Sequence, residues 1–292
     1  MKKILKLGAL LVVAATFVVS SLGTQAMAAG QTGASPMIVG GSAAQYQYGA
    51  VSLWYPDRHR CGASLISPYW ALTAAHCAPI LIPGQTEVRA SSRVNNSLEV
   101  EKVGLAAVYT HPEYNPQAGD FINDVALIKF TKPVTRMQPL QIPFVSPAVG
   151  SLHTLAGWGW ICEDATNPSC GHSVNILQEL KMKIVDDAQC GWLFDPEHQL
   201  CSVAASGANA NGCYGDSGSP LVRKGIFSKW VLTGVTVGDG DYDVDHPNPC
   251  STNSSGGQGA GVWIDVSKYT PWILETVLYH SGKAQLPAVA KQ

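Results

Sequence analysis

The sequence Gly-Asp-Ser-Gly-Ser-Pro at residues 215–220 decides how the rest of the chain is interpreted. Its serine, Ser217, has a glycine on each side within two residues, which is typical of a tight turn. A serine hydroxyl is a poor nucleophile at its ordinary pKa. A reactive serine therefore needs a neighbouring base, and the base needs a third group to hold its tautomer. We interpret Ser217 as a candidate nucleophile whose partners come from elsewhere in the chain.

Two earlier stretches supply the partners. Residues 72–77, Leu-Thr-Ala-Ala-His-Cys, contain the imidazole of His76, and residues 123–127, Asn-Asp-Val-Ala-Leu, contain the carboxylate of Asp124. Each residue alone would more often be a core or turn residue. The order His, Asp, Ser, with steps of 48 (124 − 76) and 93 (217 − 124) residues, favours a catalytic triad. An α/β-hydrolase esterase is disfavoured, because that fold orders the groups Ser, acid, His.

Short β-branched and aromatic runs recur between Gly, Pro, Asn and Asp turns. These runs are residues 50–55, 63–66, 126–130, 152–157, 180–185, 221–222, 230–237 and 261–266. Residues 268–279 instead place apolar side chains at helical spacings of three and four. The pattern predicts an all-β fold with one C-terminal helix. The 255 residues after position 37 (292 − 37) exceed a usual single core, which favours two small β-barrels.

The N-terminal residues have the layout of a secretory signal. Three lysines precede an apolar run at residues 7–19, and small residues end at Ala28. The run is shorter than the roughly 20 residues that span a bilayer, so we expect cleavage and no membrane anchor. The expected organisation is a signal peptide (1–28), a short propeptide (29–37) and a catalytic unit (38–292) with its two barrels. The product is expected to be secreted, extracellular and monomeric.

Composition excludes some function classes. A formal net charge of −2 with 14% charged residues gives no nucleic-acid signature. All eight cysteines follow the signal, which suits an oxidising compartment, and none forms a CxxC pair. Four disulfides are therefore favoured over a zinc site, although sequence alone leaves 105 connectivities open. We expect no metal and no cofactor.

The three motifs resemble the TAAHC, DIAL and GDSGGP motifs of the chymotrypsin/trypsin-like serine proteases, in their secreted bacterial form. The sequence Ile-Val-Gly-Gly at residues 38–41 matches the start of that family, and the likeness extends to about Tyr279. The resemblance implies two six-stranded antiparallel Greek-key β-barrels with a C-terminal α-helix, and a serine endopeptidase acting on proteins or peptides. In that family Ser217 would attack, His76 would move the proton and Asp124 would stabilise the imidazolium. The amides of Gly215 and Ser217 would form the oxyanion hole.

The resemblance also implies activation by cleavage. A cut between Met37 and Ile38 would free an α-ammonium that pairs with the carboxylate of Asp216, so the translated chain would be a zymogen. A buried carboxylate beside the nucleophile needs such a partner. Because position 37 is Met, we expect either an activating protease that accepts an apolar residue or autoactivation.

The same comparison implies four cysteine pairs. They are Cys61–Cys77 beside His76, Cys190–Cys201 in an intermediate loop, Cys213–Cys250 in the substrate-pocket wall, and Cys162–Cys170 as a local staple.

Specificity is expected to depend on the residue at the pocket base. Asn211, six residues before Ser217 and followed by Gly212, occupies that position and has no charge. Together with Gly261, which leaves room in the pocket wall, it favours a bulky apolar or aromatic substrate residue. Neutral polar or acidic residues stay open, because an asparagine both donates and accepts hydrogen bonds. The acidic residues 239–245 leave basic specificity as an alternative; a calcium loop there is less favoured than a solvated acidic loop.

The wall strand departs from the family pattern. Val237, Gly238 and Asp239 stand where relatives usually have Ser-Trp-Gly, so the aromatic pocket lid is missing, and Ser219 replaces a usual glycine. A catalytically weak or inactive homologue, acting as a secreted binding or adhesion module, is therefore the alternative to an active enzyme.

Overall fold

The computed structural model describes residues 38–119, 121–163, 170, 172–191, 194–239, 250–253 and 255–291. The expected signal peptide (1–28), the propeptide (29–37) and residues 240–245 of the acidic stretch lie outside these ranges. In the described part of the chain, no helix is both long and apolar enough to cross a membrane.

The first half of the described chain forms a closed antiparallel barrel with strand order β2-β3-β4-β7-β6-β5. Its strands are β2 (Ala50–Trp54), β3 (His59–Ser67), β4 (Trp70–Thr73), β5 (Glu87–Ala90), β6 (Glu101–Thr110) and β7 (Ala126–Phe130). Leu53, Leu65, Leu72 and Leu127 are fully buried in the core. Burial of these branched side chains favours closure of the sheet on itself.

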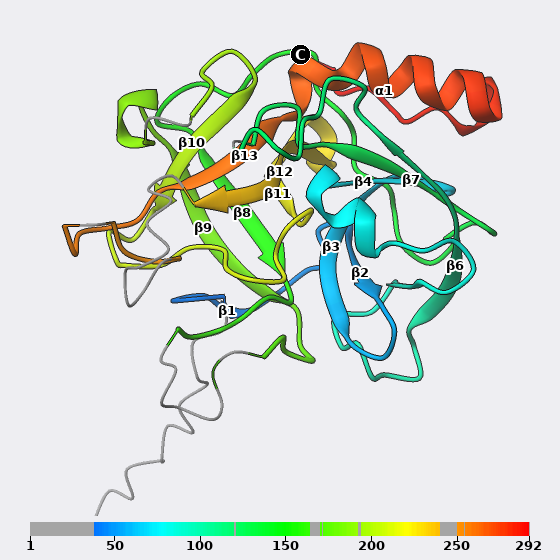
Figure 1. The fold of residues 1–292 in the computed structure, drawn as a ribbon, viewed down its shortest axis with the longest axis horizontal. Helices are drawn as coiled ribbons and strands as arrows, with labels where there is room; N and C mark the ends of the chain where they lie inside the picture. The colour runs from blue at the N-terminus through cyan, green and yellow to red at the C-terminus, as the bar shows by residue number, and fades with distance from the viewer. Residues whose placement is uncertain are drawn as a thin grey trace, which may run out of the picture. The chain divides into compact units, whose positions relative to one another are not determined.

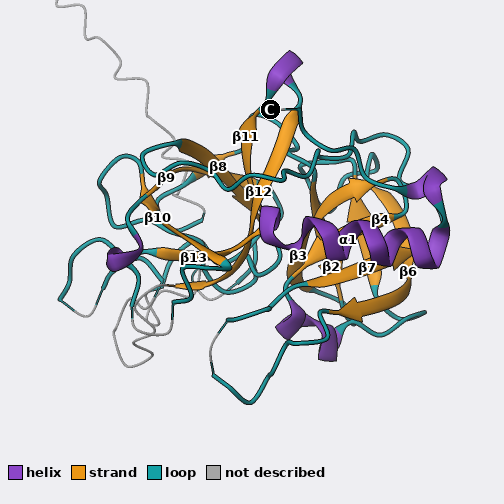
Figure 2. Cartoon of the chain, turned by 90° about the horizontal axis from the view of Figure 1, so that it is seen from above, coloured by secondary structure: helices purple, strands orange, loops and turns teal. Residues whose placement is uncertain are grey.

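The second half forms another barrel, in the order β9-β10-β13-β12-β11-β8, and β8 closes it by pairing with β9. Its strands are β8 (Leu152–Gly157), β9 (Gln178–Ile184), β10 (Gln199–Ala204), β11 (Pro220–Lys224), β12 (Trp230–Asp239) and β13 (Gly261–Asp265). The two-residue strand β1 (Ser42–Ala43) pairs with β9. Figures 1 and 2 show the strands of the two barrels as separate groups. The expected fold class is confirmed.

The helix α1 (Val266–Ser281) follows β13 directly. Asp265 caps it, because its carboxylate accepts from the amide of Ser267 at 3.0 Å, and this cap explains why the helix begins two residues before the expected start. The helix lies over strands of the first barrel in both views (Figures 1 and 2), and Lys129 of β7 donates to the carbonyl of His280. Four short 3₁₀ helices complete the described elements: η1 (Ala75–Ile80), η2 (Asp187–Gln189), η3 (Ile226–Ser228) and η4 (Lys283–Gln285).

The sequence pattern misses five strands, namely β1, β4, β5, β6 and β10. β6 is the longest of them, and its sequence mixes charged residues, glycine and alanine with few β-branched side chains. Much of it is half-buried or exposed, so the alternation that reveals a strand is weak.

The structure joins the eight cysteines as Cys61–Cys77, Cys162–Cys170, Cys190–Cys201 and Cys213–Cys250. These are the four pairs that the resemblance implies.

Candidate active site

His76 and Asp124 are brought together by the pairing of β4 with β7. Thr73, the last residue of β4, lies opposite Ala126, the first residue of β7, so the segments that continue from these ends are neighbours. Nδ1 of His76 lies 2.6 Å from Oδ2 of Asp124, and the His76 amide donates to Oδ1 at 2.7 Å. A carboxylate only accepts, so Nδ1 carries the proton and Nε2 is left as the basic nitrogen.

The loop before Asp124 is held by α1. Asn123 has a left-handed backbone with φ of 56°, which asparagine tolerates better than most residues. Its Oδ1 accepts a hydrogen bond of 2.9 Å from the hydroxyl of Tyr269. Asp124 itself is fully buried. The C-terminal helix therefore helps to fix the carboxylate that orients His76.

Ser217 lies in the turn before β11, and β3 of the other barrel holds this turn in place. The amide of Gly62 donates to the carbonyl of Ser217 at 2.7 Å, and Ser64 Oγ donates to the carbonyl of Gly218 at 3.1 Å. A β-carbon at Gly218 would lie 2.2 Å from the Gly62 oxygen, so only glycine fits after the serine. Ser217 and His76 line the same two cavities, but in the described residues no hydrogen bond joins their side chains.

The amides of Gly215 and Ser217 donate to no acceptor within the described ranges. The amide between them, of Asp216, instead donates to the carbonyl of Cys213 at 2.9 Å. Gly215 has φ of 91°, a conformation that a side chain would oppose. Two unpaired donors flanking Asp216 at the nucleophile turn are suited to a negatively charged oxygen.

Asp216 is fully buried, and its carboxylate accepts from the amides of Gly159 at 2.8 Å and Cys213 at 3.0 Å. Burial raises its pKa to about 7, although both amide bonds oppose this shift. No ion pair in the described residues includes Asp216. Ile38 is also fully buried, and the carbonyl of the next residue, Val39, accepts from the amide of Asn211 at 3.1 Å.

One cavity, of about 470 Å³, extends from Ser217 along β12; we call it the strand-side cavity. Of the expected substrate-binding residues it is lined by Gly212, Val237, Gly238 and Asp239. Three aromatic residues that the sequence did not indicate, Tyr114, Phe121 and Tyr214, also line it.

Phe121 lies against the wall strand from a different loop. A β-carbon at Gly238 would come within 2.4 Å of the Phe121 ring. The aromatic side chain that is absent from the wall strand thus has a counterpart in the loop before Asp124.

Asn211 and Gly261 are neighbours but do not line the strand-side cavity. A β-carbon at Gly261 would lie 2.7 Å from Oδ1 of Asn211. That oxygen accepts from the amide of Gly212, whereas the buried Nδ2 has no hydrogen-bond partner in the described part of the chain. Asn211 is 1% exposed, so it lies beneath Gly212 rather than at the cavity surface.

A second cavity, of about 560 Å³, shares Ser217, His76 and Tyr214 with the first and is otherwise lined by different residues; we call it the arginine-side cavity. Arg58, Arg60 and the disulfide Cys61–Cys77 contribute to its lining. Trp160 and Tyr214 also line it, with ring centroids 4.8 Å apart. Its lining includes His76 and Ser217 from the sequence motifs, but the sequence did not indicate that Arg58, Arg60 or Trp160 would meet them.

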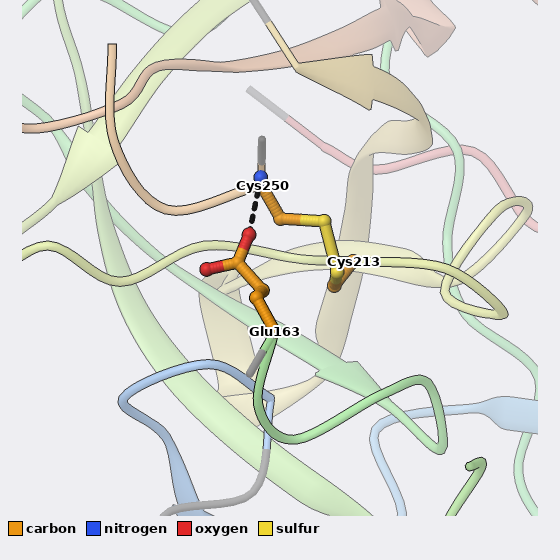
Figure 3. A group of neighbouring side chains, drawn as sticks. All are labelled: Glu163, Cys213 and Cys250. Carbon is orange, nitrogen blue, oxygen red and sulfur yellow. Dashed lines mark hydrogen bonds between the residues drawn. A yellow bond between two sulfur atoms is a disulfide. The ribbon is translucent and has the colours of Figure 1, made fainter. Parts of the chain in front are cut away.

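The wall disulfide Cys213–Cys250 is in contact with Glu163, as Figure 3 shows. The Glu163 carboxylate accepts from the amide of Cys250, from the amide of Ser251 at 3.2 Å and from Ser251 Oγ at 2.6 Å. Carboxylate and sulfur atoms together could suggest a metal site, but both sulfurs belong to the disulfide and are not thiolates. Glu163 therefore connects the loop that begins at the Cys162–Cys170 staple to the pocket wall.

Comparisons with known proteins find similar sequences and structures. A family model described as Trypsin matches residues 38–273. Serine proteinase stubble of Drosophila melanogaster is 30% identical over 76% of this chain, and a trypsin of Sarcophaga bullata is 32% identical over 75% of it. The matched region spans 28% of stubble and 79% of the Sarcophaga trypsin.

Among solved structures, neuropsin, a serine protease expressed in the limbic system of mouse brain, superposes with a TM-score of 0.67. The match has 25% identity and covers 82% of this chain and all of that one. Transmembrane protease serine 9 of Rattus norvegicus is 34% identical, and the match spans 19% of its length.

Proposed function

The chain belongs to the trypsin family, and from that premise we propose that it is a secreted serine endopeptidase in which Ser217, His76 and Asp124 hydrolyse peptide bonds. The observation that carries the proposal is the short contact between His76 and a fully buried Asp124, because His76 lines both of the cavities that Ser217 lines.

The chemistry follows from the proton positions. Nε2 of His76 takes the proton of Ser217 as Oγ attacks the scissile carbonyl, and Asp124 stabilises the resulting imidazolium. The carbonyl oxygen becomes negative and is bound by the amides of Gly215 and Ser217. His76 then gives its proton to the leaving amine, and water hydrolyses the acyl-enzyme by the same route in reverse. The bond between Ser217 and His76 forms as substrate closes the site, which is common where apo geometry is loose.

For primary specificity we propose a bulky apolar or aromatic residue before the cut. Among the described residues, three aromatic side chains and no lysine or arginine line the strand-side cavity. Asp239, which also lines it, supports the alternative of a basic residue. Profiling with a peptide library separates the two, because dominance of Lys or Arg before the cut would overturn the apolar assignment.

For activation we propose a cut between Met37 and Ile38, made by another protease or by the enzyme itself. The hydrogen-bond partners of the buried Asp216 carboxylate among the described residues are two amides and no cation, so a new α-ammonium at Ile38 would find an acceptor there. Residues 1–28 as signal, 29–37 as propeptide and 38–292 as catalytic unit complete the proposed organisation.

The decisive experiment is covalent labelling of Ser217 by a sulfonyl fluoride or an organophosphorus reagent, in protein cut before Ile38. We expect one adduct per chain, located at Ser217 by mass spectrometry, and none in Ser217→Ala. His76→Ala should label far more slowly, because the serine has lost its base. A folded, cut protein that takes up no label would instead support a non-catalytic binding module.

A further inference from the structure

The two cavities that meet at Ser217 differ in the charges of their described lining residues. Among the described residues, the arginine-side cavity is lined by Arg58 and Arg60 and by no aspartate or glutamate. The strand-side cavity is lined by Asp124 and Asp239 and, within the described ranges, by no lysine or arginine. A peptide bound across Ser217 therefore contacts negatively charged residues on one side of its scissile bond and positively charged residues on the other.

Both arginines are available to an incoming ligand. Arg58 is exposed, and none of the ion pairs in the described residues includes Arg58 or Arg60. Arg60 donates through Nε to the carbonyl of Tyr55 at 2.7 Å. That bond orients the guanidinium and leaves its two Nη groups without an acceptor in the described part of the chain. A guanidinium group held in one orientation in this way can donate two parallel hydrogen bonds to a carboxylate.

The direction of the substrate follows from the proposed function, on which this inference rests. The residue before the scissile bond occupies the strand-side cavity, beside Gly212 and Val237. The leaving amine is protonated by His76 and continues away from that cavity. The residues after the scissile bond therefore enter the arginine-side cavity, past the aromatic pair of Trp160 and Tyr214 that lines it.

We propose that the enzyme selects substrates with aspartate or glutamate among the first three residues after the scissile bond. Arg58 and Arg60 are the specificity-determining residues. Because the pairs are partly exposed, each carboxylate is expected to raise kcat/KM by only about three- to tenfold over lysine at the same position. The preference should weaken as salt rises, since exposed charges are screened.

The test uses internally quenched peptides that share one sequence before the cut and differ only at the three residues after it. The peptides carry aspartate, glutamine or lysine there. We expect wild-type kcat/KM to fall from aspartate to glutamine to lysine at low salt, and the spread to narrow at 0.5 M salt (a Debye length of roughly 4 Å). The double variant Arg58→Glu, Arg60→Glu should reverse the order.

Arg223→Glu is the matched control, because Arg223 is exposed on β11 and lines neither cavity. It should keep the wild-type order. If the double variant fails to fold, Arg58→Glu alone serves, since that side chain is exposed and makes no hydrogen bond or ion pair within the described ranges. Equal cleavage of all three peptides, or an order that the arginine variants leave unchanged, would overturn the proposal.

A small ester whose leaving group is an alcohol separates this proposal from the proposed function. It places no residue in the arginine-side cavity, so wild type should hydrolyse it whatever its preference among the peptides, and Arg223→Glu should hydrolyse it at the wild-type rate. Normal ester hydrolysis without a preference for aspartate overturns the arginine assignment alone. Absence of both ester hydrolysis and Ser217 labelling overturns the proposed function, and the arginine assignment with it.

Discussion

Nε2 of His59 donates to the carbonyl oxygen of Gly215 at 2.8 Å, across 156 residues of sequence. A carbonyl only accepts, so Nε2 carries the proton, and Nδ1 accepts from Ser52 Oγ at 2.7 Å. Burial lowers the pKa of His59 to about 4, so the ring is neutral at neutral pH. His59 therefore fixes the orientation of the glycine whose amide is the proposed oxyanion donor.

The first prediction concerns this positioning bond. His59→Phe keeps an aromatic ring but leaves the carbonyl of Gly215 unpaired. If the proposed function holds, kcat should fall about tenfold, less than the roughly 10²–10³ lost when an oxyanion donor is removed, while KM changes little. Steady-state kinetics on active-site-titrated enzyme measures both values.

Partial recovery of kcat in His59→Gln, whose amide can donate, would identify the donor as the cause. A kcat in His59→Phe equal to that of wild type would contradict the positioning role.

The second prediction concerns acid stability. Burial lowers the pKa of His153 to about 4, as it does for His59. Unfolded histidine titrates near its ordinary 6.5, so between these values the unfolded chain binds more protons and stability falls as pH falls. Each ring contributes up to about 3 kcal/mol across that window. Urea unfolding at pH 7 and pH 4.5 should show a smaller loss in His153→Gln than in wild type.

His172→Gln is the control for this prediction, because His172 is exposed. It should leave the pH dependence unchanged. If His153→Gln and wild type lose the same unfolding free energy between pH 7 and pH 4.5, the buried ring does not titrate as expected.

Local sequence signals predicted much of this molecule. Alternating runs indicated several strands, and the three-and-four spacing indicated α1. The family motifs proposed His76 and Asp124 as partners, and the structure places their Nδ1 and Oδ2 atoms 2.6 Å apart. Each signal lies within a few consecutive residues, where turn chemistry and periodicity operate.

The sequence could not reveal contacts between residues that lie far apart in the chain and meet only in the folded structure. Glu163 meets Cys250 across 87 residues and His59 meets Gly215 across 156, and no periodicity links such pairs. Phe121 takes up a position against Gly238 from another loop, so the missing aromatic lid in the wall strand could not predict it. The placement of Asn211 beneath Gly212 likewise depends on how the turn packs.

The third prediction concerns Asp216 in the uncut chain. Its folded pKa of about 7 exceeds the ordinary 3.8, so the folded state binds more protons between these values. The protonated Asp216 carboxyl therefore stabilises the fold fully below about pH 4, and this stabilisation is lost as pH rises through 7. In uncut Ser217→Ala protein, the unfolding free energy should fall by up to about 4 kcal/mol between pH 4 and 8, and the further substitution Asp216→Asn should abolish this fall.

Cleavage before Ile38 supplies the comparison for Asp216. An α-ammonium would favour the ionised carboxylate, so the cut Ser217→Ala protein should lack the decline above pH 5. Urea unfolding of the cut and uncut forms over that range measures the difference. Identical curves would mean that Ile38 and Asp216 do not pair.

The fourth prediction concerns the bond between Glu163 and the pocket wall. Glu163→Gln removes the charge that binds the amides of Cys250 and Ser251, and the unfolding free energy should fall by about 1–2 kcal/mol. The Ser251 amide should exchange its hydrogen faster, because its acceptor is weaker.

Since Cys250 lines the strand-side cavity, KM should rise about threefold or more while kcat changes less. Glu197→Gln is the control, because Glu197 is exposed and lines neither cavity, and it should change none of these values. If both hydrogen exchange at the Ser251 amide and KM are unchanged, Glu163 contacts the pocket wall without stabilising it.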